Sequence, residues 1–183
     1  MLIGITGTNG SGKGTVVEYL KTKGFTHYSA RSVFIKEVER QGLPIDRDTI
    51  VAVANELRSK FGPAYIVETL LIKALADGGD AVIESIRTVG EAQSLKEAGG
   101  VLVAVDAEPR LRYDRVLLRG SETDHIDFDT FIAQEQRELR SDDPTRQNIL
   151  GVVALADFKV TNNGSRELLG KEIEHVLTEC SKE

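Results

Sequence analysis

The sequence predicts an α/β fold in which a parallel β-sheet is covered by helices on both faces. A glycine-rich loop at residues 7–15 lies between a strand-like apolar run and a helix-like run, which is the order of a βα unit. Two further apolar runs, 81–83 and 101–105, are short and are separated by a segment with helical spacing. Such runs are typical of parallel strands buried on both faces. Their alternation with helices favours a sheet built of βαβ units.

The loop after the first strand carries the most specific pattern in the chain, G-T-N-G-S-G-K-G-T. Its glycines let backbone N–H groups turn toward phosphate oxygens, and the N-terminus of the next helix adds partial positive charge. Lys13 supplies a full charge that can reach the outer phosphates of a nucleotide. The spacing of Lys13 and both flanking elements disfavour the alternative, a flexible glycine turn. The residues expected to contact phosphate are Thr8, Asn9, Gly10, Ser11, Gly12, Lys13, Gly14 and Thr15.

One position departs from the common form of a phosphate-binding loop. Ser or Thr usually follows the lysine and holds Mg²⁺ with its hydroxyl, whereas here Gly14 follows and the hydroxyl belongs to Thr15. The form G-x-x-G-x-G-K-G-T resembles the loop of adenylate kinases and related nucleoside monophosphate kinases. This resemblance implies ATP and Mg²⁺ as cofactors, Lys13 as a catalytic residue and Thr15 as a candidate metal ligand.

Helix breakers delimit the elements between this loop and residue 80. Gly24 ends the helix that begins at the loop, and Gly42 with Pro44 ends a second helix. Asp46 is a suitable N-cap for a third helix, which stops at Gly62. In order, we expect a helix over 12–23, a short strand at 27–28, and helices over 33–41, 47–61 and 64–76.

Turn residues and apolar runs delimit the second half of the chain. Pro109 opens a helix that runs to Arg119, a polar loop follows at 120–124, and Asp127 caps the next helix. The segment 149–156 is ambiguous and is interpreted as helical. In order, we expect strands at 81–83, 101–105 and 158–161, and helices over 90–98, 109–119, 128–140 and 165–179.

Four of the expected features follow the carboxyl ends of strands. They are the glycine loop, Glu84 with Arg87, the segment after Asp106, and the turn after Thr161. The carboxyl ends of parallel strands meet at one edge of a sheet, and ligands bind beyond that edge. We therefore expect these four features to form one site.

Composition and charge narrow the classes of function. The chain has 183 residues, which suits a single domain over 1–183, and its net charge of −6 comes without a basic tract, which argues against general nucleic-acid binding. No apolar run approaches about 18 residues, so we expect no membrane span. Cys180 is the only cysteine, which excludes a disulfide within one chain. Because a strand is expected from Leu2, we expect no leader peptide and a cytoplasmic location.

Two charged residues follow the apolar run at 81–83. Glu84 is placed like the acid that organises Mg²⁺ at a strand end, directly or through water, and the alternative is a structural ion pair. The stretch Glu84-Ser85-Ile86-Arg87 resembles the D-G-x-P-R of adenylate kinases, whose arginine binds the acceptor's phosphate. Here the Asp is Glu, the Gly is Ser and the Pro is missing. The resemblance therefore implies a phosphate-binding role for Arg87, against the alternative of a surface charge, without fixing the acceptor.

Arginines recur in the helix expected over 109–119. Arg115 and Arg119 are four residues apart and share one face, where like charges repel unless anions lie near them. The spacing resembles the R-x-x-x-R at the start of the lid in nucleotide kinases, where arginines stabilise the transferring phosphoryl group. The alternative is a solvated helix face whose charge Asp114 and Glu108 balance.

The lid implied by this resemblance covers residues 120–141. Its end, Arg140-Ser141-Asp142-Asp143, resembles the R-x-D-D of adenylate kinase lids. Arg137 and Arg140 also suit the C-terminus of a helix because of its dipole, so that alternative stays open. The segment lacks the four cysteines of zinc-bearing lids.

The acceptor is expected to bind the region 29–76. Tyr28-Ser29 followed by a helix loosely resembles the adenylate kinase segment that carries an acceptor-phosphate arginine, and Lys36 falls near the place of that arginine. Each cation of the region is individually more often a surface charge than a ligand. The candidates for acceptor binding are Ser29, Arg31, Lys36, Arg47, Arg58 and Arg87.

The turn after the last strand has more than one interpretation. In related kinases this loop packs near the adenine, which makes Asn163 a candidate contact of the cofactor. The segment 156–164 also resembles the A-D-x-x-I-x-N-x-G of dephospho-coenzyme A kinases. The alternative is a tight turn at 162–164 without a ligand.

The resemblance to P-loop nucleotide kinases extends over most of the chain. It implies a P-loop NTPase fold, a three-layer α/β/α sandwich whose five parallel strands lie in the order 2-3-1-4-5, with helical acceptor-binding and lid insertions. The implied function is ATP- and Mg²⁺-dependent phosphoryl transfer to a small-molecule acceptor, a nucleoside monophosphate, with AMP the leading candidate. Two alternatives stay open: transfer to a ribose hydroxyl, as in dephospho-coenzyme A kinases, and a regulatory or RNA-processing ATPase. The oligomeric state stays open as well.

Overall fold

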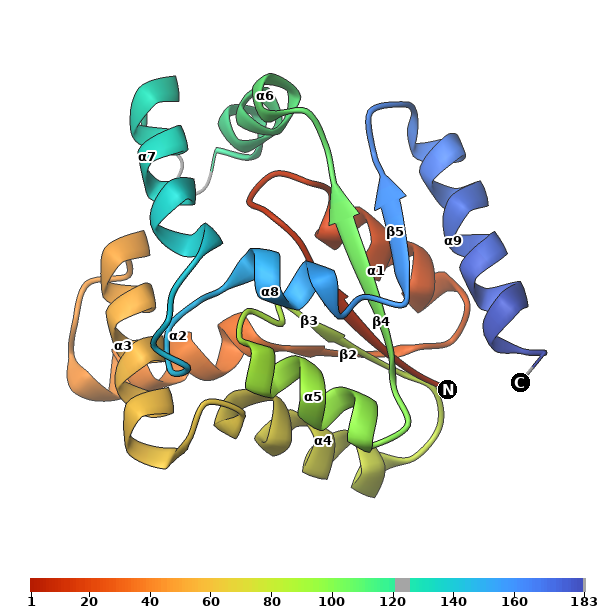
Figure 1. The fold of residues 1–183 in the computed structure, drawn as a ribbon, viewed down its shortest axis with the longest axis horizontal. Helices are drawn as coiled ribbons and strands as arrows, with labels where there is room; N and C mark the ends of the chain where they lie inside the picture. The colour runs from red at the N-terminus through yellow and green to blue at the C-terminus, as the bar shows by residue number, and fades with distance from the viewer. Residues whose placement is uncertain (121–125, 183) are drawn as a thin grey trace.

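A parallel sheet forms the centre of the molecule (Figure 1). The computed structural model describes residues 1–120 and 126–182. Its strands are β1 (Leu2–Thr6), β2 (Thr26–Ser29), β3 (Ala81–Glu84), β4 (Val101–Asp106) and β5 (Phe158–Thr161). They lie in the order β2-β3-β1-β4-β5, and each neighbouring pair is parallel. The predicted fold class and strand order are confirmed.

The helices begin and end close to the residues that the sequence indicates. Asp46 and Asp127 each accept a hydrogen bond from a backbone N–H in the first turn of their helices. The segment that the sequence leaves ambiguous forms a short helix capped by Asn148. Residues 121–124 of the predicted polar loop lie outside the described residues. The helices are α1 (Lys13–Thr22), α2 (Ala30–Gln41), α3 (Arg47–Phe61), α4 (Tyr65–Asp77), α5 (Val89–Glu97), α6 (Pro109–Arg119), α7 (Phe128–Leu139), α8 (Ile149–Ala154) and α9 (Arg166–Cys180).

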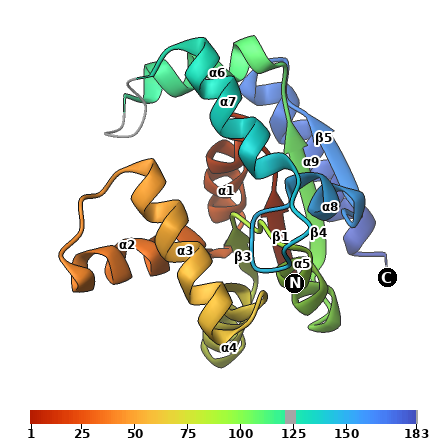
Figure 2. The same cartoon turned by 60° about the vertical axis from the view of Figure 1, so that its left-hand side comes forward.

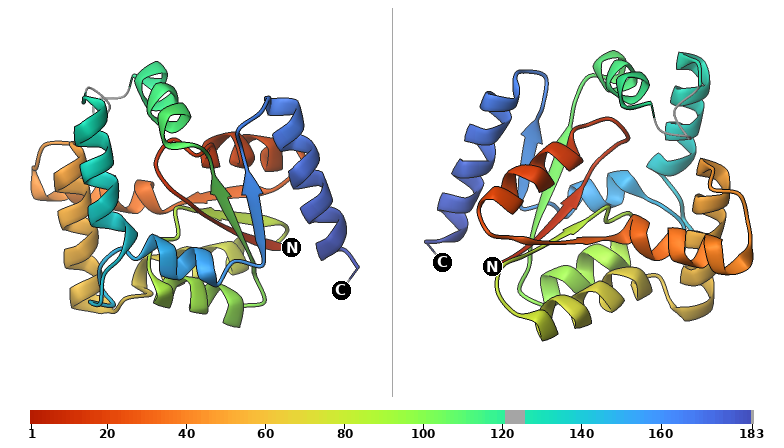
Figure 3. Two further views of the ribbon diagram at one scale, coloured as in Figure 1. Left: turned by 45° about the horizontal axis from the view of Figure 1, so that its top comes forward. Right: turned by 180° about the vertical axis from the view of Figure 1, so that it is seen from behind.

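Helices cover the sheet on both faces, which explains the wholly apolar strands. In β3, Ala81 and Ile83 pack into one core cluster and Val82 packs into the other. Helices α1 and α9 lie on the face of Val82, and α4 and α5 lie on the opposite face (Figures 1 and 3). A strand with both faces buried has no place for polar residues, so its sequence shows no alternation.

Helix α7 begins beside α6 and runs toward α8 and the end of β3 (Figure 2). Tyr113 and Val116 of α6 pack against Phe131 of α7 in a small apolar cluster of their own. At its other end α7 reaches α3 through ion pairs, such as that between Arg137 and Asp48 at 3.7 Å. Across residues 1–120 and 126–182, the structure contains no helix both long and apolar enough to cross a bilayer.

Candidate active site

The glycine loop between β1 and α1 has a backbone that favours glycine at three positions, Gly7, Gly10 and Gly12. Gly10 and Gly12 have φ angles of 76° and 104°, in the region that favours glycine. A Cβ at Gly10 would lie 2.3 Å from the carbonyl oxygen of Arg112, and one at Gly12 would lie 2.1 Å from Nδ2 of Asn162. A narrow backbone cradle that leads directly into a helix N-terminus fits the phosphate chain of a nucleotide.

The ends of β4 and β5 hold this loop in place. The Thr8 hydroxyl donates to Oδ1 of Asp106 at 3.1 Å. Asn162 donates from Nδ2 to the carbonyl oxygen of Ser11 at 2.9 Å. The expected meeting of the loop with the segments after Asp106 and Thr161 is therefore confirmed.

Lys13, the first residue of α1, is almost completely buried, with 8% of its surface exposed. Its ammonium group donates to the carbonyl oxygens of Gly7 and Thr8 at 3.0 and 2.7 Å. Burial, and after it the charge of Arg87, lower the pKa of Lys13 to about 7, although Glu84 acts in the opposite direction. The electrostatic influence of Glu84 and Arg87 places the end of β3 at the same site as the loop.

Glu84 and Thr15 are the two predicted metal ligands. Oε2 of Glu84 lies 3.2 Å from Nε2 of His27. Burial raises the pKa of Glu84, but the hydrogen bond of His27 and the charge of Lys13 outweigh it, so the pKa lies below its usual value. Thr15 is half-buried in the first turn of α1.

Glu84 and Thr15 offer one carboxylate and one hydroxyl as possible ligands for Mg²⁺. A carboxylate and a hydroxyl suit Mg²⁺ in a nucleotide site, where phosphate and water supply most of the ligands. A closed metal centre is a different arrangement, and in the described part of the chain no three His, Cys, Asp or Glu side chains are grouped to form one. The residues present therefore fit a metal that arrives with a nucleotide.

Two predicted arginines of α6 lie at the glycine loop and at the turn after β5 that holds it. Arg115 donates from Nη2 to the carbonyl oxygen of Asn162 at 2.9 Å, and burial lowers its pKa. Its Nη1 is buried without a hydrogen-bond partner. Nη2 of Arg119 lies 3.5 Å from Oδ1 of Asn9. Arg119 thus reaches the loop directly and Arg115 reaches it through Asn162, and their catalytic role stays a prediction.

A third arginine of the same helix, Arg112, has a structural role that the sequence did not single out. It is 3% exposed and pairs through both Nη atoms with the carboxylate of Glu135 on α7. Its Nε donates to the carbonyl oxygen of Ala107 at 2.7 Å, and Nη1 lies 3.4 Å from that of Asn9. Arg112 therefore connects α6, α7 and the glycine loop.

Two further predicted residues, Asn163 and Arg140, lie at the surface. Asn163 is exposed and accepts a hydrogen bond from the backbone N–H of Glu108 at 2.9 Å. Arg140 is exposed just beyond α7 and lines a shallow depression with Ser141 and Asp142. Part of the expected lid, residues 121–125, lies outside the described residues, and α7 is its main described element.

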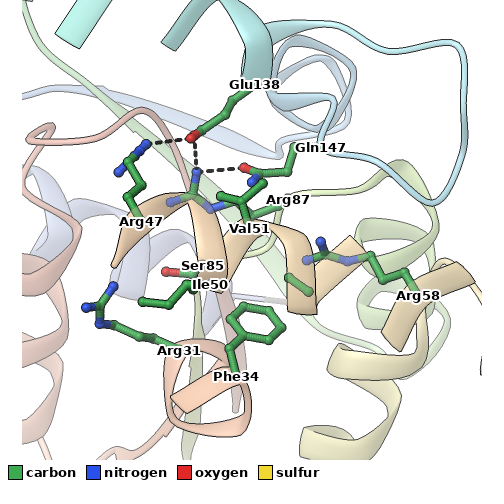
Figure 4. A pocket seen from close by; sticks show the side chains of 11 residues that line it. Arg31, Phe34, Arg47, Ile50, Val51, Arg58, Ser85, Arg87, Glu138 and Gln147 are labelled. Atoms are coloured by element: carbon green, nitrogen blue, oxygen red, sulfur yellow. Dashed lines mark hydrogen bonds and ion pairs between the residues drawn. The ribbon is translucent and has the colours of Figure 1, made fainter. Parts of the chain in front are cut away.

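A cavity of about 90 Å³ opens beside the end of β3, between α2, α3 and the C-terminal end of α7 (Figure 4). Phe34 and Ile50 form part of its apolar wall. Its charged lining consists of Arg31, Arg47, Arg58, Arg87 and Glu138. Four guanidinium groups around one carboxylate give the cavity an excess of positive charge, which favours an anionic ligand.

Glu138 bridges two of these arginines (Figure 4). Arg47 donates from Nη2 to Oε1 at 2.6 Å, and Arg87 donates from Nη1 to Oε2 at 2.9 Å. The same Nη1 of Arg87 lies 3.0 Å from Oε1 of Gln147. Burial lowers the pKa of Arg87, Glu138 raises it, and the nearby charges of Arg47 and Arg58 lower it further. The arginines are thus crowded and largely removed from water.

Arg58, a predicted acceptor ligand, is also part of the core. Its side chain is 1% exposed, and Nε donates to Oε1 of Glu91 at 2.8 Å. The other oxygen of Glu91 accepts from the backbone N–H groups of Arg87 and Thr88, where it completes a capping box at the start of α5. Nη1 of Arg58 is buried without a hydrogen-bond partner. Arg58 therefore fixes α3 to α5 and still has one donor unused.

The remaining predicted acceptor residues are placed differently around the cavity. Ser85, which was not predicted as a ligand, lines the cavity and has a φ of 73°, at the position where the adenylate kinase pattern has glycine. Ser29 precedes α2, and its carbonyl oxygen accepts from the Ser32 hydroxyl. Arg31 lines the cavity, whereas Lys36 is exposed on α2 and is not part of the lining.

Two residues of this site, Glu138 and Gln147, were missed by reasoning from the sequence. Glu138 lies 91 positions from Arg47 and 51 from Arg87, and a single sequence contains no direct signal for such pairs. One indirect signal does exist. Phe131, Glu135 and Glu138 are spaced as one helical face, so two carboxylates occupy the core-facing stripe of α7. Carboxylates in such positions indicate buried cationic partners.

The chain has a P-loop kinase-like α/β fold, which it shares with several solved structures. The chain is similar to TT1252 from Thermus thermophilus, with a TM-score of 0.66 and 21% identity over 98% of this chain and 97% of that one. It is also similar to shikimate kinase from Bacteroides thetaiotaomicron (TM-score 0.59, 15% identity, 97% and 98% covered). Dephospho-CoA kinase from Campylobacter jejuni gives a TM-score of 0.55 with 18% identity over 99% and 97%. At these identities the likeness concerns the fold.

Sequence relatives identify the family. Residues 3–141 match the family model of the AAA domain. The chain is 32% identical to a UPF0200 protein of Pyrobaculum aerophilum over 97% of both chains, and 31% identical to one of Methanocaldococcus jannaschii over 98% of this chain and 90% of that one. The chain therefore belongs to the AAA domain family and to the UPF0200 proteins.

Proposed function

We propose that this protein is an ATP- and Mg²⁺-dependent kinase whose acceptor is a nucleoside monophosphate, with AMP the leading candidate. The observation that carries the proposal is the pairing of two sites at the end of β3. On one side lies the glycine loop with Lys13, and on the other lies the cavity lined by four arginines. Arg87 belongs to the cavity and also acts electrostatically on Lys13, so the two sites are neighbours.

The nucleotide side consists of the loop backbone, Lys13, Glu84, Thr15 and the arginines of α6. ATP would supply the phosphoryl group and Mg²⁺ would offset its charge. Lys13 would hold the outer phosphates, and Glu84 with Thr15 would hold the metal. Arg115 and Arg119 would stabilise negative charge that spreads over the phosphoryl oxygens in the transition state. Asn163, in the turn after β5, would lie near the adenine.

The lining of the cavity favours an acceptor that is already an anion. A hydroxyl acceptor needs a base to remove its proton, whereas a phosphate monoester needs none. Glu138 is the carboxylate among the lining residues, and it is already held by Arg47 and Arg87. Each of its oxygens already accepts a hydrogen bond from an arginine, so this carboxylate is engaged rather than free to contact an acceptor hydroxyl. Arg31, Arg58 and Arg87 would bind the acceptor's phosphate, with Ser29 and Lys36 at the edge of the region.

The proposal extends to the organisation of the chain. Residues 1–183 would form one kinase domain, with acceptor binding in 29–76 and a lid over 120–141 that excludes water during transfer. A net charge of −6 fits a small-molecule partner better than general binding to nucleic acid. We place the activity in the cytoplasm, where ATP and nucleoside monophosphates are present.

Transfer to a ribose hydroxyl is the second candidate, because the segment 156–164 resembles dephospho-coenzyme A kinases. In the structure Asp157 accepts from the backbone N–H of Leu102 at 2.8 Å and pairs with Lys96. Asn162 holds the glycine loop. These contacts give the segment a supporting role in the fold, which does not distinguish between acceptors.

An acceptor panel tests the proposal. The protein is mixed with ATP and Mg²⁺ and with each of several nucleoside monophosphates or dephospho-coenzyme A, and ADP formation is followed. We expect stimulation by a monophosphate, AMP first. Stimulation by dephospho-coenzyme A alone would transfer the assignment to the second candidate. Equal ADP formation with and without any acceptor would refute both kinase assignments and leave an ATPase.

A further inference from the structure

The carboxylate of Glu138 lies between two arginines that come from different parts of the chain. Arg47 begins α3, Arg87 follows β3, and each donates to a different oxygen of Glu138. The exposed fraction of the side chain is 18% for Arg47, 17% for Arg87 and 11% for Glu138. Glu138 therefore holds the C-terminal end of α7 against the acceptor side through a largely desolvated bridge.

This carboxylate leaves some donors of the cavity unused. Arg47 Nε and Arg58 Nη1 are buried and have no hydrogen-bond partner. Both arginines line the cavity together with Arg87 (Figure 4). A buried N–H without a partner is unfavourable, because it has lost its hydrogen bonds to water. Glu138 offers two oxygens and one charge, whereas a phosphate monoester offers three oxygens and up to two charges. A phosphate therefore matches this set of donors better than the side chain that now holds them.

We propose that the acceptor's phosphate binds between Arg47 and Arg87 in the place of Glu138, so that α7 and the acceptor compete for one pair of arginines. Arg47 is then an acceptor ligand and Glu138 a gate on the anion site. The identity of the acceptor rests on the proposed function, whereas the competition concerns anion binding alone.

The competition also selects the class of acceptor. A ligand with a single carboxylate replaces Glu138 by an equivalent group and gains little. A phosphate dianion adds a charge and an oxygen, and both are stabilised by donors that Glu138 does not reach. The site therefore favours phosphate monoesters over carboxylic acids of similar size.

Titration calorimetry with inorganic phosphate and with acetate tests this gate on the full chain. We expect Glu138→Gln to bind phosphate about tenfold more tightly than the unaltered protein, because a charge-assisted competitor is removed. Acetate affinity should stay below phosphate affinity in both proteins. The matched control is Asp48→Asn, which removes the exposed ion pair with Arg137 at the same junction of α3 and α7 and should leave phosphate affinity unchanged.

Two double variants locate the gain, since phosphate can also bind the glycine loop. The gain should survive Lys13→Met in the Glu138→Gln protein and should disappear with Arg47→Met. The gate would be overturned if Lys13→Met removed the gain in phosphate affinity. It would also be overturned if Glu138→Gln bound phosphate no more tightly than the unaltered protein. Weaker binding would mean that Glu138 orients the arginines for the ligand.

A second measurement uses the unaltered protein and does not depend on the folding of any variant. Phosphate should increase amide hydrogen exchange at the C-terminal end of α7, because it displaces Glu138. Decreased exchange there would contradict the gate. Neither experiment requires turnover. If phosphate binds as expected but the protein transfers no phosphoryl group, only the proposed function is refuted. If the protein turns over but Glu138→Gln leaves the phosphate affinity unchanged, only the gate is refuted.

Discussion

At the level of single residues, the surroundings of Lys13 set the pKa of its ammonium group. Its ammonium group is enclosed by the glycine loop and by the charge of Arg87, and the pKa falls to about 7 for that reason. An ordinary lysine stays charged far above that pH. Near neutrality Lys13 therefore changes its protonation with its ligand: a polyphosphate beside it would stabilise the charged form and raise its pKa.

The affinity for Mg-ATP should consequently depend on pH. Above pH 7 the free protein has lost the Lys13 proton and must take it up to bind the anion, so affinity falls as pH rises, by up to about tenfold per unit. Below pH 7 Lys13 is already charged and contributes no slope. Calorimetry at pH 8 in buffers of different ionisation enthalpy should show proton uptake. A flat profile from pH 7 to 9 would contradict this picture, as would an unchanged slope in Lys13→Met.

Replacing Lys13 itself should abolish phosphoryl transfer without unfolding the protein. Lys13→Met keeps an unbranched side chain, one atom shorter, and removes the charge that would hold the outer phosphates. Lys21→Met is the matched control on the same helix, because Lys21 is exposed and pairs with Glu18. We expect full turnover in the control and none in Lys13→Met, with similar melting temperatures. Turnover retained by Lys13→Met would show that the loop does not act in catalysis.

Arg119 should act mainly in the transition state. Its guanidinium lies near Asn9 at the edge of the loop, where charge on the transferring group would develop. We expect Arg119→Ala to lower kcat about hundredfold and to change the KM for ATP by less than about threefold. Arg110→Ala, on the same helix, serves as control because Arg110 is exposed and pairs with Asp114. An effect confined to KM would mean that Arg119 binds ATP equally in the ground state.

At the scale of elements, one buried ion pair connects α3 to α5. Arg58 and Glu91 are each 1% exposed, and Glu91 also caps α5 through backbone N–H groups. Removing one partner of a buried pair leaves an uncompensated charge in the core. The pair therefore joins α3 to α5, and the hydrogen bond from the backbone N–H of Arg87 to Glu91 connects Arg87 to the same pair.

This pair gives a stability prediction. Arg58→Met should lower the free energy of unfolding by about 3–5 kcal/mol, measured by urea denaturation. Arg40→Met removes an exposed arginine that pairs with Glu37 and should change stability very little. Equal losses in the two variants would mean that the Arg58–Glu91 bridge does not hold α3 to α5.

Local signals in the sequence were sufficient to predict the elements. Asp46, Asp127 and Pro109 act through their immediate neighbours, so the starts of their helices were predicted within a residue. The segment at 149–156 was ambiguous because a short apolar run fits a strand as well as a helix. Its type is decided by the cap at Asn148, whose side chain accepts from the N–H of Gly151.

At the scale of the whole molecule, the sheet order and the meeting of the strand ends were predictable and the cavity was not. The strand pattern predicted a parallel sheet, and the resemblance to P-loop kinases implied the order β2-β3-β1-β4-β5. The cavity depends on side chains brought together from α2, α3, β3 and α7. Glu138 was missed because its partners are distant in the chain, and Arg58 was expected as a ligand although it is also buried against Glu91.

We propose above that the glycine loop and the arginine-lined cavity act together to move a phosphoryl group between two nucleotides. The most direct test is to incubate the protein with γ-labelled ATP, Mg²⁺ and AMP and to separate the products, with Lys13→Met as the blank. We predict label in ADP formed from AMP, at a rate that rises with AMP concentration. Label found only in inorganic phosphate, at a rate independent of every monophosphate supplied, would contradict the claim.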